Sequence, residues 1–461
     1  MTHDDDFARL AADPVRNTMR TVIVYHAGCW DGFCAAWVLR WKYPNAEFHA
    51  AHYGAESPDV TGARVVIADF SYKRDVLRGM CQQALHVTLL DHHVTAQAEL
   101  LPVIEELKDV HPVPLSDGIS AYVDKGDAEL VAGYSWSRAK NGGVIAYAGG
   151  GRANAKMVYM HRLVLNAPAG TLVDHRNRVT TDNRRINLRL ATRQQNAANM
   201  DRGSEWKGVT PRTGGWVAQI TVDGVNEYLG LYPSAEMAAR AYDDAARSRF
   251  GNFARCNFGD HNEPFPANCT IVFDMSKSGG RLAWEWINRD GANGDATDSA
   301  PWLVDYTEDR DLWRHALPFS REINAALRSY PLDFDGWDAM ARRDPVEWLV
   351  PEGRAILRHD AQVVDQHVRH AREIELAGYK VLAVNATVLF SEIAGKLAEG
   401  RPFGACYFDR ADGLRQWSLR SQDGGVDVSE VAVRLGGGGH RNAAGFEERL
   451  PTVSVSGVAG D

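Results

Sequence analysis

Three short motifs near the start of the chain carry side chains that commonly bind metal ions. They read YHAGCWDG, IADFS and LLDHH, and they contain His26, Asp31, Asp69, Asp91, His92 and His93. Carboxylates together with imidazoles suit Mn²⁺ or Mg²⁺ better than a metal that prefers thiolates. A carboxylate on a central strand can bridge two such ions, which activate water and stabilise the leaving oxygen of a phosphoester. The motifs therefore predict a two-metal hydrolytic centre.

A second set of candidate residues lies in the segments VDHRNRVTTDNRRINLR and QQNAANM. A single-metal nuclease needs a general base, and histidine suits that role at neutral pH, so His175 is the candidate. It also needs a hard cation held by oxygen ligands, which Asp174 and Asn196 supply if a hairpin faces a helix. Asn187 is placed to pin the connecting loop and to orient His175. This pattern predicts a nuclease site.

A glycine run near the end of the chain, RLGGGGHRNAAGF, offers a third kind of site. Four glycines allow the backbone to approach a phosphate or a sugar closely. His440 and Arg441 follow with donors for an anion, and with Gly438 they are the candidate substrate-binding residues.

The first three motifs end short apolar runs that read as strands of a parallel sheet. These runs are TVIVYH, EFHAAHY, ARVVIADF and HVTLLD, and segments with helical spacing separate them. Alternating strands and helices predict a parallel sheet covered on both faces. Such sheets place their chemistry at the carboxyl ends of the strands, where His26, Asp69 and Asp91 stand.

This pattern is interrupted from about Val110 to Phe258 and resumes at Asn268. Between residues 151 and 258 the chain has 16 Lys and Arg against 9 Asp and Glu, although its net charge is −9. The earlier alternation of strands and helices then returns, with a strand, a glycine turn and a helix in NCTIVFDMSKSGGRLAWEWI. An insertion in a surface loop explains the interruption, because loop closure costs little more as a loop lengthens. The basic balance predicts that the insert meets a polyanion.

The last part of the insert, residues 206–258, reads as three short strands and one amphipathic helix with Ser234 as its cap. A small sheet with basic and amide side chains can enter a major groove. The candidate DNA-binding residues on its open face are Lys207, Arg212, Gln219, Thr221 and Tyr228.

The bulk properties indicate a soluble protein of three or four domains. No apolar stretch is long enough to span a membrane, and the acidic N-terminus is not a signal peptide. The six cysteines include no CxxC pair, which favours a reducing cytoplasm. The predicted divisions are a disordered tail (1–19), an α/β domain in two parts (20–109 and 268–335), an insert in two modules (110–200 and 204–258), linker helices with a C-terminal α/β domain (336–450), and a second tail (451–461).

The motifs YHxxCxDGFxAA, ADFS and LDHH resemble the DHH phosphoesterase family, which includes RecJ-like exonucleases, nano-RNases and cyclic-dinucleotide phosphodiesterases. The resemblance implies two Mn²⁺ ions, with His26, Asp31, Asp69 and His92 at ligand positions and Asp69 and His92 in catalysis. It places Asp91 behind the histidines or on the metals, and His93 beside the substrate. The run GGGGHxxAAGF is similar to the C-terminal domain that accompanies DHH domains and holds the substrate.

Two points of the DHH resemblance stay open in the sequence. The family's fourth motif supplies one more Asp, and DYTEDRDLW offers Asp309 or Asp311, of which Asp309 is preferred. Many members also have an additional Asp between the first His and the DG, where this chain has Cys29. Either Cys29 ligates in its place, or one metal is held more weakly.

The insert resembles two other families. From about Pro112 to Met200 it is similar to HNH homing endonucleases of the form that lacks zinc, which implies that His175 is the base, that Asp174 and Asn196 bind one Mg²⁺ and that Asn187 is structural. His161 and Arg162 are expected near this site. Residues 206–258 resemble the ethylene-response-factor type DNA-binding domain. In that domain Lys207, Arg212 and Gln219 match contacting positions, but Thr221 and Asn226 replace arginines of the plant proteins.

Together these patterns predict a bifunctional metal-dependent nuclease. The split domain would hydrolyse phosphodiesters in short or single-stranded nucleic acid or in a small nucleotide, and the insert would nick or cut duplex DNA. Two alternatives remain: a DNA-binding protein whose DHH domain has lost turnover, and a DHH enzyme whose insert is an inert passenger.

Overall fold

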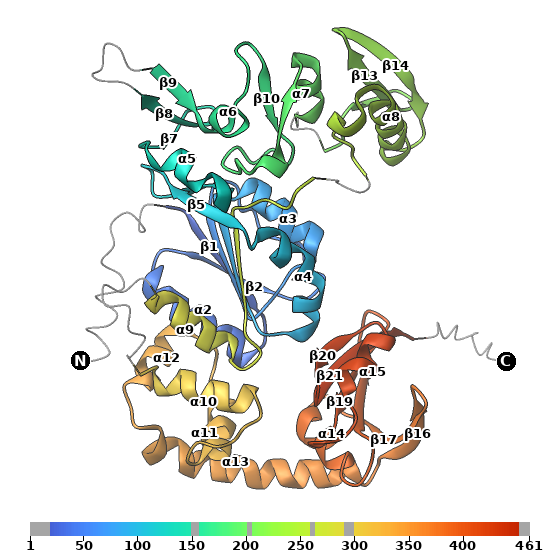
Figure 1. Cartoon of the computed structure of the whole chain (residues 1–461). Coiled ribbons are helices and arrows are strands. Elements are labelled where there is room, and N and C mark those ends of the chain that lie inside the picture. The colour runs from blue at the N-terminus through green and yellow to red at the C-terminus, as the bar shows by residue number, and fades with distance from the viewer. Residues whose placement is uncertain (1–18, 149–155, 201–204, 259–262, 290–298, 451–461) are drawn as a thin grey trace, which may run out of the picture.

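The computed structural model describes residues 19–148, 156–200, 205–258, 263–289 and 299–450 (Figure 1). The two predicted tails therefore lie outside the described residues, except for Met19. The described chain is a mixed α/β structure with one parallel sheet and several smaller sheets. None of its described helices combines the length and the apolar character that crossing a membrane would require.

A parallel five-stranded sheet forms the centre of the molecule, with the strand order β15-β4-β3-β1-β2. The strands are β1 (Thr21–His26), β2 (Glu47–Ala51), β3 (Arg64–Ala68), β4 (His86–Asp91) and β15 (Cys269–Phe273). Side chains alternate between the two faces of a strand. In β1, Ile23 packs into one core with Trp37, while Val22 and Val24 pack into the other with Leu77.

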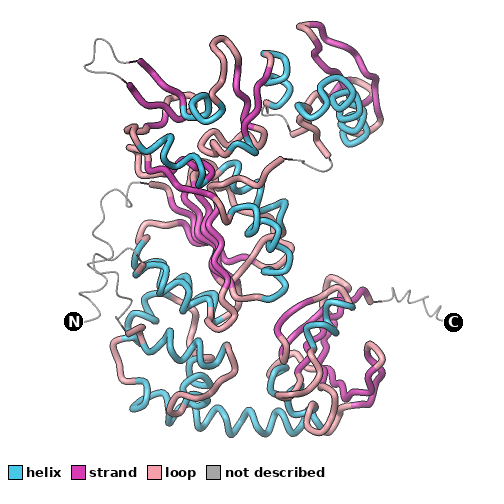
Figure 2. The backbone as a smooth tube through the Cα atoms, in the orientation of Figure 1, coloured by secondary structure: helices cyan, strands magenta, loops and turns pink. Residues whose placement is uncertain are grey.

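Helices cover both faces of this sheet, as the alternation in the sequence predicts (Figure 2). One face is covered by α2 (Trp30–Lys42) and α9 (Gly279–Asn288), and the other by α3 (Arg74–Gln83) and α4 (Val94–Leu107). Strand β15 and helix α9 come from the part of the chain after residue 268. The central domain is therefore assembled from two segments on either side of the insert.

The two ends of the insert meet beside α4. The backbone N–H of Phe265 donates to Glu106 Oε1 at 2.6 Å, and Asn268 Nδ2 donates to the carbonyl oxygen of Cys81 at 2.8 Å. At the same edge, His86 Nδ1 lies 2.8 Å from the hydroxyl of Tyr122, which belongs to the insert. The insert thus rests on the amino ends of the strands, away from their carboxyl ends.

The insert contains two small bodies (Figure 1). The first holds β5 (Val110–Pro114), β6 (Ser120–Asp124), α5 (Ala128–Ala132), β7 (Ser137–Arg138), β8 (Val144–Ala148), β9 (Lys156–Tyr159), α6 (Met160–Leu165), β10 (Leu172–His175), β11 (Leu188–Ala191) and α7 (Arg193–Asn199). The second holds β12 (Val209–Arg212), β13 (Gly215–Val222), β14 (Val225–Tyr232) and α8 (Ala235–Phe250). Ser234 caps α8 by accepting a hydrogen bond from the N–H of Met237.

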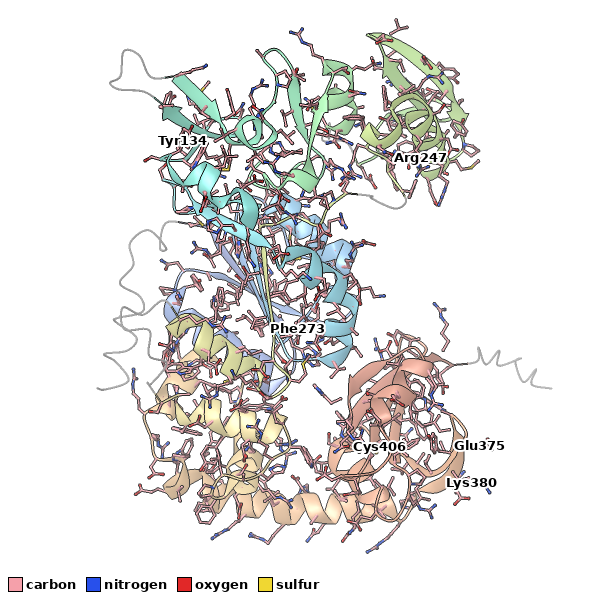
Figure 3. The ribbon with its side chains drawn as sticks, viewed as in Figure 1. Tyr134, Arg247, Phe273, Glu375, Lys380 and Cys406 are labelled. Atoms are coloured by element: carbon pink, nitrogen blue, oxygen red, sulfur yellow. The ribbon has the colours of Figure 1, made fainter. Side chains whose placement is uncertain are left out.

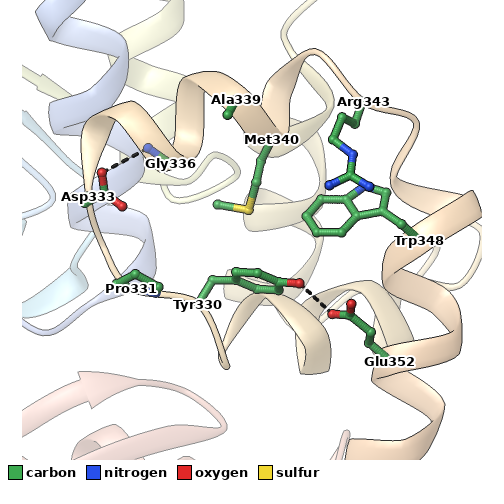
Figure 4. Close-up of a pocket in the computed structure, with 9 residues that line it drawn as sticks. All are labelled: Tyr330, Pro331, Asp333, Gly336, Ala339, Met340, Arg343, Trp348 and Glu352. Carbon is green, nitrogen blue, oxygen red and sulfur yellow. Dashed lines mark hydrogen bonds between the residues drawn. The ribbon is translucent and has the colours of Figure 1, made fainter.

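Four helices lead from the central domain to the C-terminal domain. They are α10 (Trp302–Asp311), α11 (Ser320–Leu327), α12 (Phe334–Ala341) and the long α13 (Pro345–Val368). A pocket between α12 and α13 is lined by Tyr330, whose hydroxyl donates to Glu352, and by Trp348, over which Arg343 stacks (Figure 4). None of the candidate ligands lines it, so we regard it as part of the helical linker.

The C-terminal domain is a six-stranded sheet in the order β16-β17-β18-β19-β21-β20. It comprises β16 (Arg372–Leu376), β17 (Tyr379–Asn385), α14 (Phe390–Leu397), β18 (Gly404–Asp409), β19 (Leu414–Arg420), α15 (Val428–Arg434), β20 (Gly438–His440) and β21 (Ala443–Arg449). The predicted glycine run forms β20, and this strand faces α4 of the central domain.

Candidate metal and nucleic-acid sites

The carboxyl ends of the central strands bring imidazole and carboxylate groups together. His92 Nε2 lies 3.0 Å from Asp69 Oδ1 and 3.5 Å from Asp31 Oδ2. His26 Nδ1 lies 3.7 Å from Asp69 Oδ2. Phe273, paired with Asp91 across the sheet, marks this end in Figure 3, whereas Tyr134 of the insert lies beyond the other end.

Several polar atoms in this cluster are buried and have no hydrogen-bond partner among the described residues. They are His26 Nδ1, Asp69 Oδ2, Asp91 Oδ2 and His92 Nδ1. Leaving buried polar atoms unpaired is costly, so such a group indicates a missing partner. Donor atoms of the sets Asp31–His92–Asp311 and Asp69–Asp91–His93 each lie within 4.8 Å of one another. Oxygen and imidazole donors at this spacing fit divalent cations such as Mn²⁺.

The ionisation of the cluster shows that its carboxylates need positive charge. Burial and the neighbouring Asp69 raise the pKa of Asp31 well above its usual value. Burial disfavours a charged His92, but Asp69 and Asp31 outweigh it and raise the pKa of His92 to about 10. Burial, with the charge of Asp69, also raises the pKa of the Cys29 thiol. A cation would supply the positive charge that a proton on His92 supplies here.

The preference for Asp309 in the fourth motif is wrong, because the structure places Asp311 in the cluster. Asp311 Oδ2 lies 3.6 Å from His92 Nε2. Asp309 instead accepts hydrogen bonds from the backbone N–H groups of Ala316 and Leu317, at 2.8 and 3.3 Å. It closes the loop after α10 and has a structural role.

Two glycines of the returning segment complete the cluster, and no sequence pattern predicted their contacts. The N–H groups of Gly279 and Gly280, at the start of α9, donate to the two oxygens of Asp31 at 2.5 and 2.9 Å. A Cβ on Gly279 would lie 2.5 Å from the Cβ of Asp69. Only glycine therefore fits where α9 meets the strand ends.

The C-terminal domain reaches the cluster through His440. Its ring centroid lies 5.3 Å from that of His92 and 5.1 Å from that of His93. Gly438 lies against Thr95 at the start of α4. Arg441, predicted to bind substrate, is instead engaged within its own domain, since its guanidinium lies 3.5 Å from Asp427 and donates to the carbonyl of Gly425.

Asp91 lies behind the histidine pair. Its Oδ1 accepts from the N–H of His92 at 2.7 Å and lies 2.6 Å from His93 Nδ1. These contacts fix the backbone turn and the ring of His93, while Oδ2 has no hydrogen-bond partner within the described part of the chain.

In the insert, β10, β11 and α7 bring a second group of polar residues together. His175 is buried, and its Nε2 lies 3.3 Å from Asn183 Oδ1. The amide nitrogen of Asn183 donates to the carbonyl oxygens of Thr180 and Thr181, so Oδ1 must face His175. Nε2 therefore carries the proton, and Nδ1 is the free base. Burial lowers the pKa of His175, which keeps the ring neutral.

Asp174 lies next to His175 and is tied to two neighbours. Arg189 Nε donates to Asp174 Oδ2 at 2.7 Å, and Asn199 Nδ2 lies 3.0 Å from Asp174 Oδ1. The α7 residue that contacts Asp174 is thus Asn199, one turn after the predicted Asn196. Because a carboxylate oxygen has two lone pairs, Oδ1 keeps one for a cation.

Asn187 has the contacts of a structural residue. Fully buried, it accepts from the N–H of Asn177 at 2.9 Å and donates to the carbonyl of Asp182 at 2.7 Å. These bonds hold the loop between β10 and β11.

His161, at the start of α6, packs edge-on to His175 with ring centroids 5.3 Å apart. Burial lowers the pKa of His161 to about 3, so this ring is also neutral. Arg162 is directed elsewhere, since it donates to the carbonyls of Thr171 and Pro168 in the loop after α6.

The second body of the insert presents an open sheet face opposite α8. Ala218 and Ile220 of β13 point toward α8 and are buried, so Gln219 and Thr221 point away from it. Tyr228 pairs with Gln219 and is 67% exposed. Arg212 at the end of β12 is exposed as well.

Lys207, predicted on that face, occupies a different position. Its ammonium donates to the carbonyls of Ala198 and Met200 at the end of α7. It therefore fastens the second body of the insert to the first.

Comparison with known proteins identifies the first body of the insert. A family model described as HNH endonuclease matches residues 158–198. A protein of Acanthamoeba polyphaga mimivirus named as an uncharacterized HNH endonuclease is 30% identical over 141 residues, which are 30% of this chain and 75% of that protein. The chain belongs to the HNH endonuclease family.

Other relatives match parts of the chain of different lengths. An uncharacterized protein of the same virus is 27% identical over 197 residues, and the chain spans 44% of its length. Dehydration-responsive element-binding protein 2A of Oryza sativa subsp. indica is 41% identical over 78 residues, or 16% of this chain and 28% of that protein. A solved structure of an uncharacterized protein from Helicobacter pylori G27 aligns over 95% of both chains at 12% identity, with a TM-score of 0.28.

The match to the HNH endonuclease family covers His161, Asp174, His175, Asn187 and Asn196. It does not extend to the cluster at the strand ends of the central domain. HNH endonucleases are metal-dependent phosphodiester hydrolases, and the family model covers part of the insert of this chain.

Proposed function

We propose that this chain is a bifunctional nuclease with two independent sites. The insert cuts or nicks duplex DNA with His175 as general base. The central domain hydrolyses phosphodiesters in short or single-stranded nucleic acid, or in a small nucleotide, at the cluster around Asp69. The unpaired buried atoms of that cluster are the observation that carries the second activity.

At the insert site the chain itself prepares the base. Asn183 holds His175 with Nδ1 unprotonated, and burial keeps the ring neutral, so Nδ1 takes a proton from an attacking water. Asp174 Oδ1 and the amide oxygen of Asn196 are the proposed ligands of one Mg²⁺. When bound, such a cation stabilises the charge that develops on the scissile phosphate.

At the cluster of the central domain, His26, Asp31, Asp69, His92 and Asp311 are the proposed ligands of two cations. When bound, the cations lower the pKa of a water and stabilise the leaving oxygen. Asp69 lies between His26 and His92 and would hold a cation together with either histidine. His440 and His93 lie beside the cluster and are placed to contact the substrate phosphate from the side of the C-terminal domain.

The second body of the insert selects the DNA. Arg212, Gln219, Thr221 and Tyr228 lie on one exposed face, which is the arrangement that a sheet needs to contact a major groove. The similarity to dehydration-responsive element-binding protein 2A, named for binding an element, supports this role.

Two single substitutions test the proposal in one experiment. Supercoiled plasmid and a labelled short RNA are incubated with Mg²⁺ or Mn²⁺ and with wild type, His175→Ala or Asp69→Ala. We expect His175→Ala to lose nicking and keep mononucleotide release, and Asp69→Ala to show the opposite pattern.

Each alternative predicts a different result. Equal nicking by wild type and His175→Ala would contradict the activity of the insert and favour the alternative in which the insert is an inert passenger. If wild type released no mononucleotides, the phosphoesterase activity would be contradicted. The alternative of a DNA-directed protein with one active site would then be favoured.

A further inference from the structure

One ligand group of the central cluster contains a thiol. The donor atoms of His26, Cys29 and Asp69 all lie within 4.8 Å of one another. Cys29 is the last residue before α2, so its side chain stands at the carboxyl end of the sheet with the other donors. The second group in the cluster, Asp31, His92 and Asp311, has no sulfur.

The two other residues of this group, His26 and Asp69, each have a buried polar atom without a hydrogen-bond partner among the described residues. Asp69 is 1% exposed, and its Oδ2 has no hydrogen-bond partner among the described residues. His26 Nδ1 is buried and likewise unpaired. One donor atom from each of the three residues lies within 4.8 Å of the others, which is the spacing of a three-ligand site with open positions.

The two groups differ in the cations they suit. Oxygen-rich sites take Mn²⁺ or Mg²⁺, whereas a thiolate with an imidazole raises affinity for Zn²⁺, Fe²⁺ or Co²⁺. We propose that Cys29 is a thiolate ligand, so that the centre holds two different cations: a borderline metal at His26–Cys29–Asp69 and a harder one at Asp31–His92–Asp311. On binding, the thiol proton passes to water and a sulfur–metal bond forms, with no change of oxidation state. This inference rests on the proposed metal centre and changes its composition.

Cobalt tests the sulfur–metal bond directly. The full chain is stripped of metal with a chelator and titrated with Co²⁺ while its absorption is recorded. Coordination by a thiolate produces a charge-transfer band in the near ultraviolet, and oxygen and nitrogen ligands alone do not. We expect the band in wild type and its loss in Cys29→Ser.

Cys34→Ser is the matched control. Cys34 is a buried thiol on α2, close to Gly280, and it belongs to none of the ligand groups. Its substitution should leave the band intact. Circular dichroism of both variants confirms that each is folded, and a band that persists in Cys29→Ser, or its absence in wild type that still binds Co²⁺, overturns the proposal.

Metal competition gives a second readout. The preference for Zn²⁺ over Mn²⁺ is measured by equilibrium dialysis. It should fall by about tenfold or more in Cys29→Asp, because substitutions around a metal site lower metal affinity by at least about that factor. An unchanged preference contradicts the thiolate ligand. If wild type binds Mn²⁺ and releases mononucleotides but shows no cobalt band, the phosphoesterase activity is supported and the thiolate ligand is contradicted. If wild type binds no cation, both the metal centre and the thiolate ligand are contradicted.

Discussion

At the scale of single residues, substitutions of Asp309 and Asp311 should distinguish an effect on stability from an effect on metal binding. Asp309→Ala removes the acceptor of the Ala316 and Leu317 N–H groups, which should lower the free energy of unfolding by about 1–3 kcal/mol. Asp311→Ala removes a proposed ligand and should weaken Mn²⁺ binding while leaving that free energy nearly unchanged in the metal-free protein. Urea unfolding and calorimetric Mn²⁺ titration measure the two effects, and the reverse pattern would restore Asp309 as the ligand.

Asn183 offers a test of the general base, because its bond to His175 sets both the tautomer and the pKa. That bond raises the pKa of His175 against the stronger effect of burial. Asn183→Ala should therefore lower plasmid nicking by about tenfold to a hundredfold and move the acid limb of the pH–rate profile to lower pH. Asn183→Asp adds a negative charge and should move the same limb to higher pH. Limbs that stay in place would mean that His175 is not the titrating base.

The sequence could predict the strand ends but not every side chain that meets there. Two residues such as Asp309 and Asp311 stand about 200° apart around a helix, and only the packing of α10 decides which one faces His92. The sequence predicts that Lys207 contacts a DNA groove, because the segment around it resembles a DNA-binding sheet. In the structure its ammonium instead donates to a carbonyl at the end of α7. Motif spacing identifies candidates, and tertiary contacts choose among them.

At the scale of elements, the start of α9 is the point where the second half of the central domain meets the first. Gly279→Ala would place a methyl group 2.5 Å from the Cβ of Asp69 and should displace that carboxylate. We expect loss of mononucleotide release and retention of nicking. Gly395→Ala in α14 is the control, since nothing lies within 4 Å of its added Cβ, and it should stabilise the helix by about 0.5–1 kcal/mol.

The contact between insert and central sheet should be sensitive to acid. His86 lies between Tyr122 and Thr270, and burial lowers its pKa to about 4. Below its unfolded pKa of about 6.5 the unfolded chain binds a proton that the folded one refuses, so stability falls as pH drops from about 6.5 toward 4. Between pH 7.5 and 5 the loss should be about 2 kcal/mol. His86→Gln should remove this part of the loss in urea unfolding, and His359→Gln, at an exposed position, should not.

The order of strands and helices was predictable, because each run of apolar residues has the right period. The assembly of β15 and α9 onto β4 and α2 was predictable in outline, since the alternation of apolar strands and amphipathic helices resumes at residue 268. The contacts that fasten the insert, such as His86 with Tyr122, were not, because they join residues that are unremarkable in their own segments.

At the scale of the whole molecule, metal should govern stability. Chelation leaves several carboxylates facing one another, and burial together with Asp69 raises the pKa of Asp31 well above its usual value. Saturating Mn²⁺, at about a hundred times its dissociation constant, should stabilise the protein by about 2.7 kcal/mol. Thermal unfolding measures this gain, which should be absent in Asp69→Ala. An equal gain in that variant would place the bound metal elsewhere.

The hydrogen bond between Glu106 and Phe265 shows that the intervening segment leaves and re-enters the central domain at one point. A segment whose ends touch does not stretch the chain that carries it, whatever its own length. One genetic event can therefore add or delete such a segment without changing which strands are neighbours. The same position would accept an unrelated domain, provided that its two ends also lie close together.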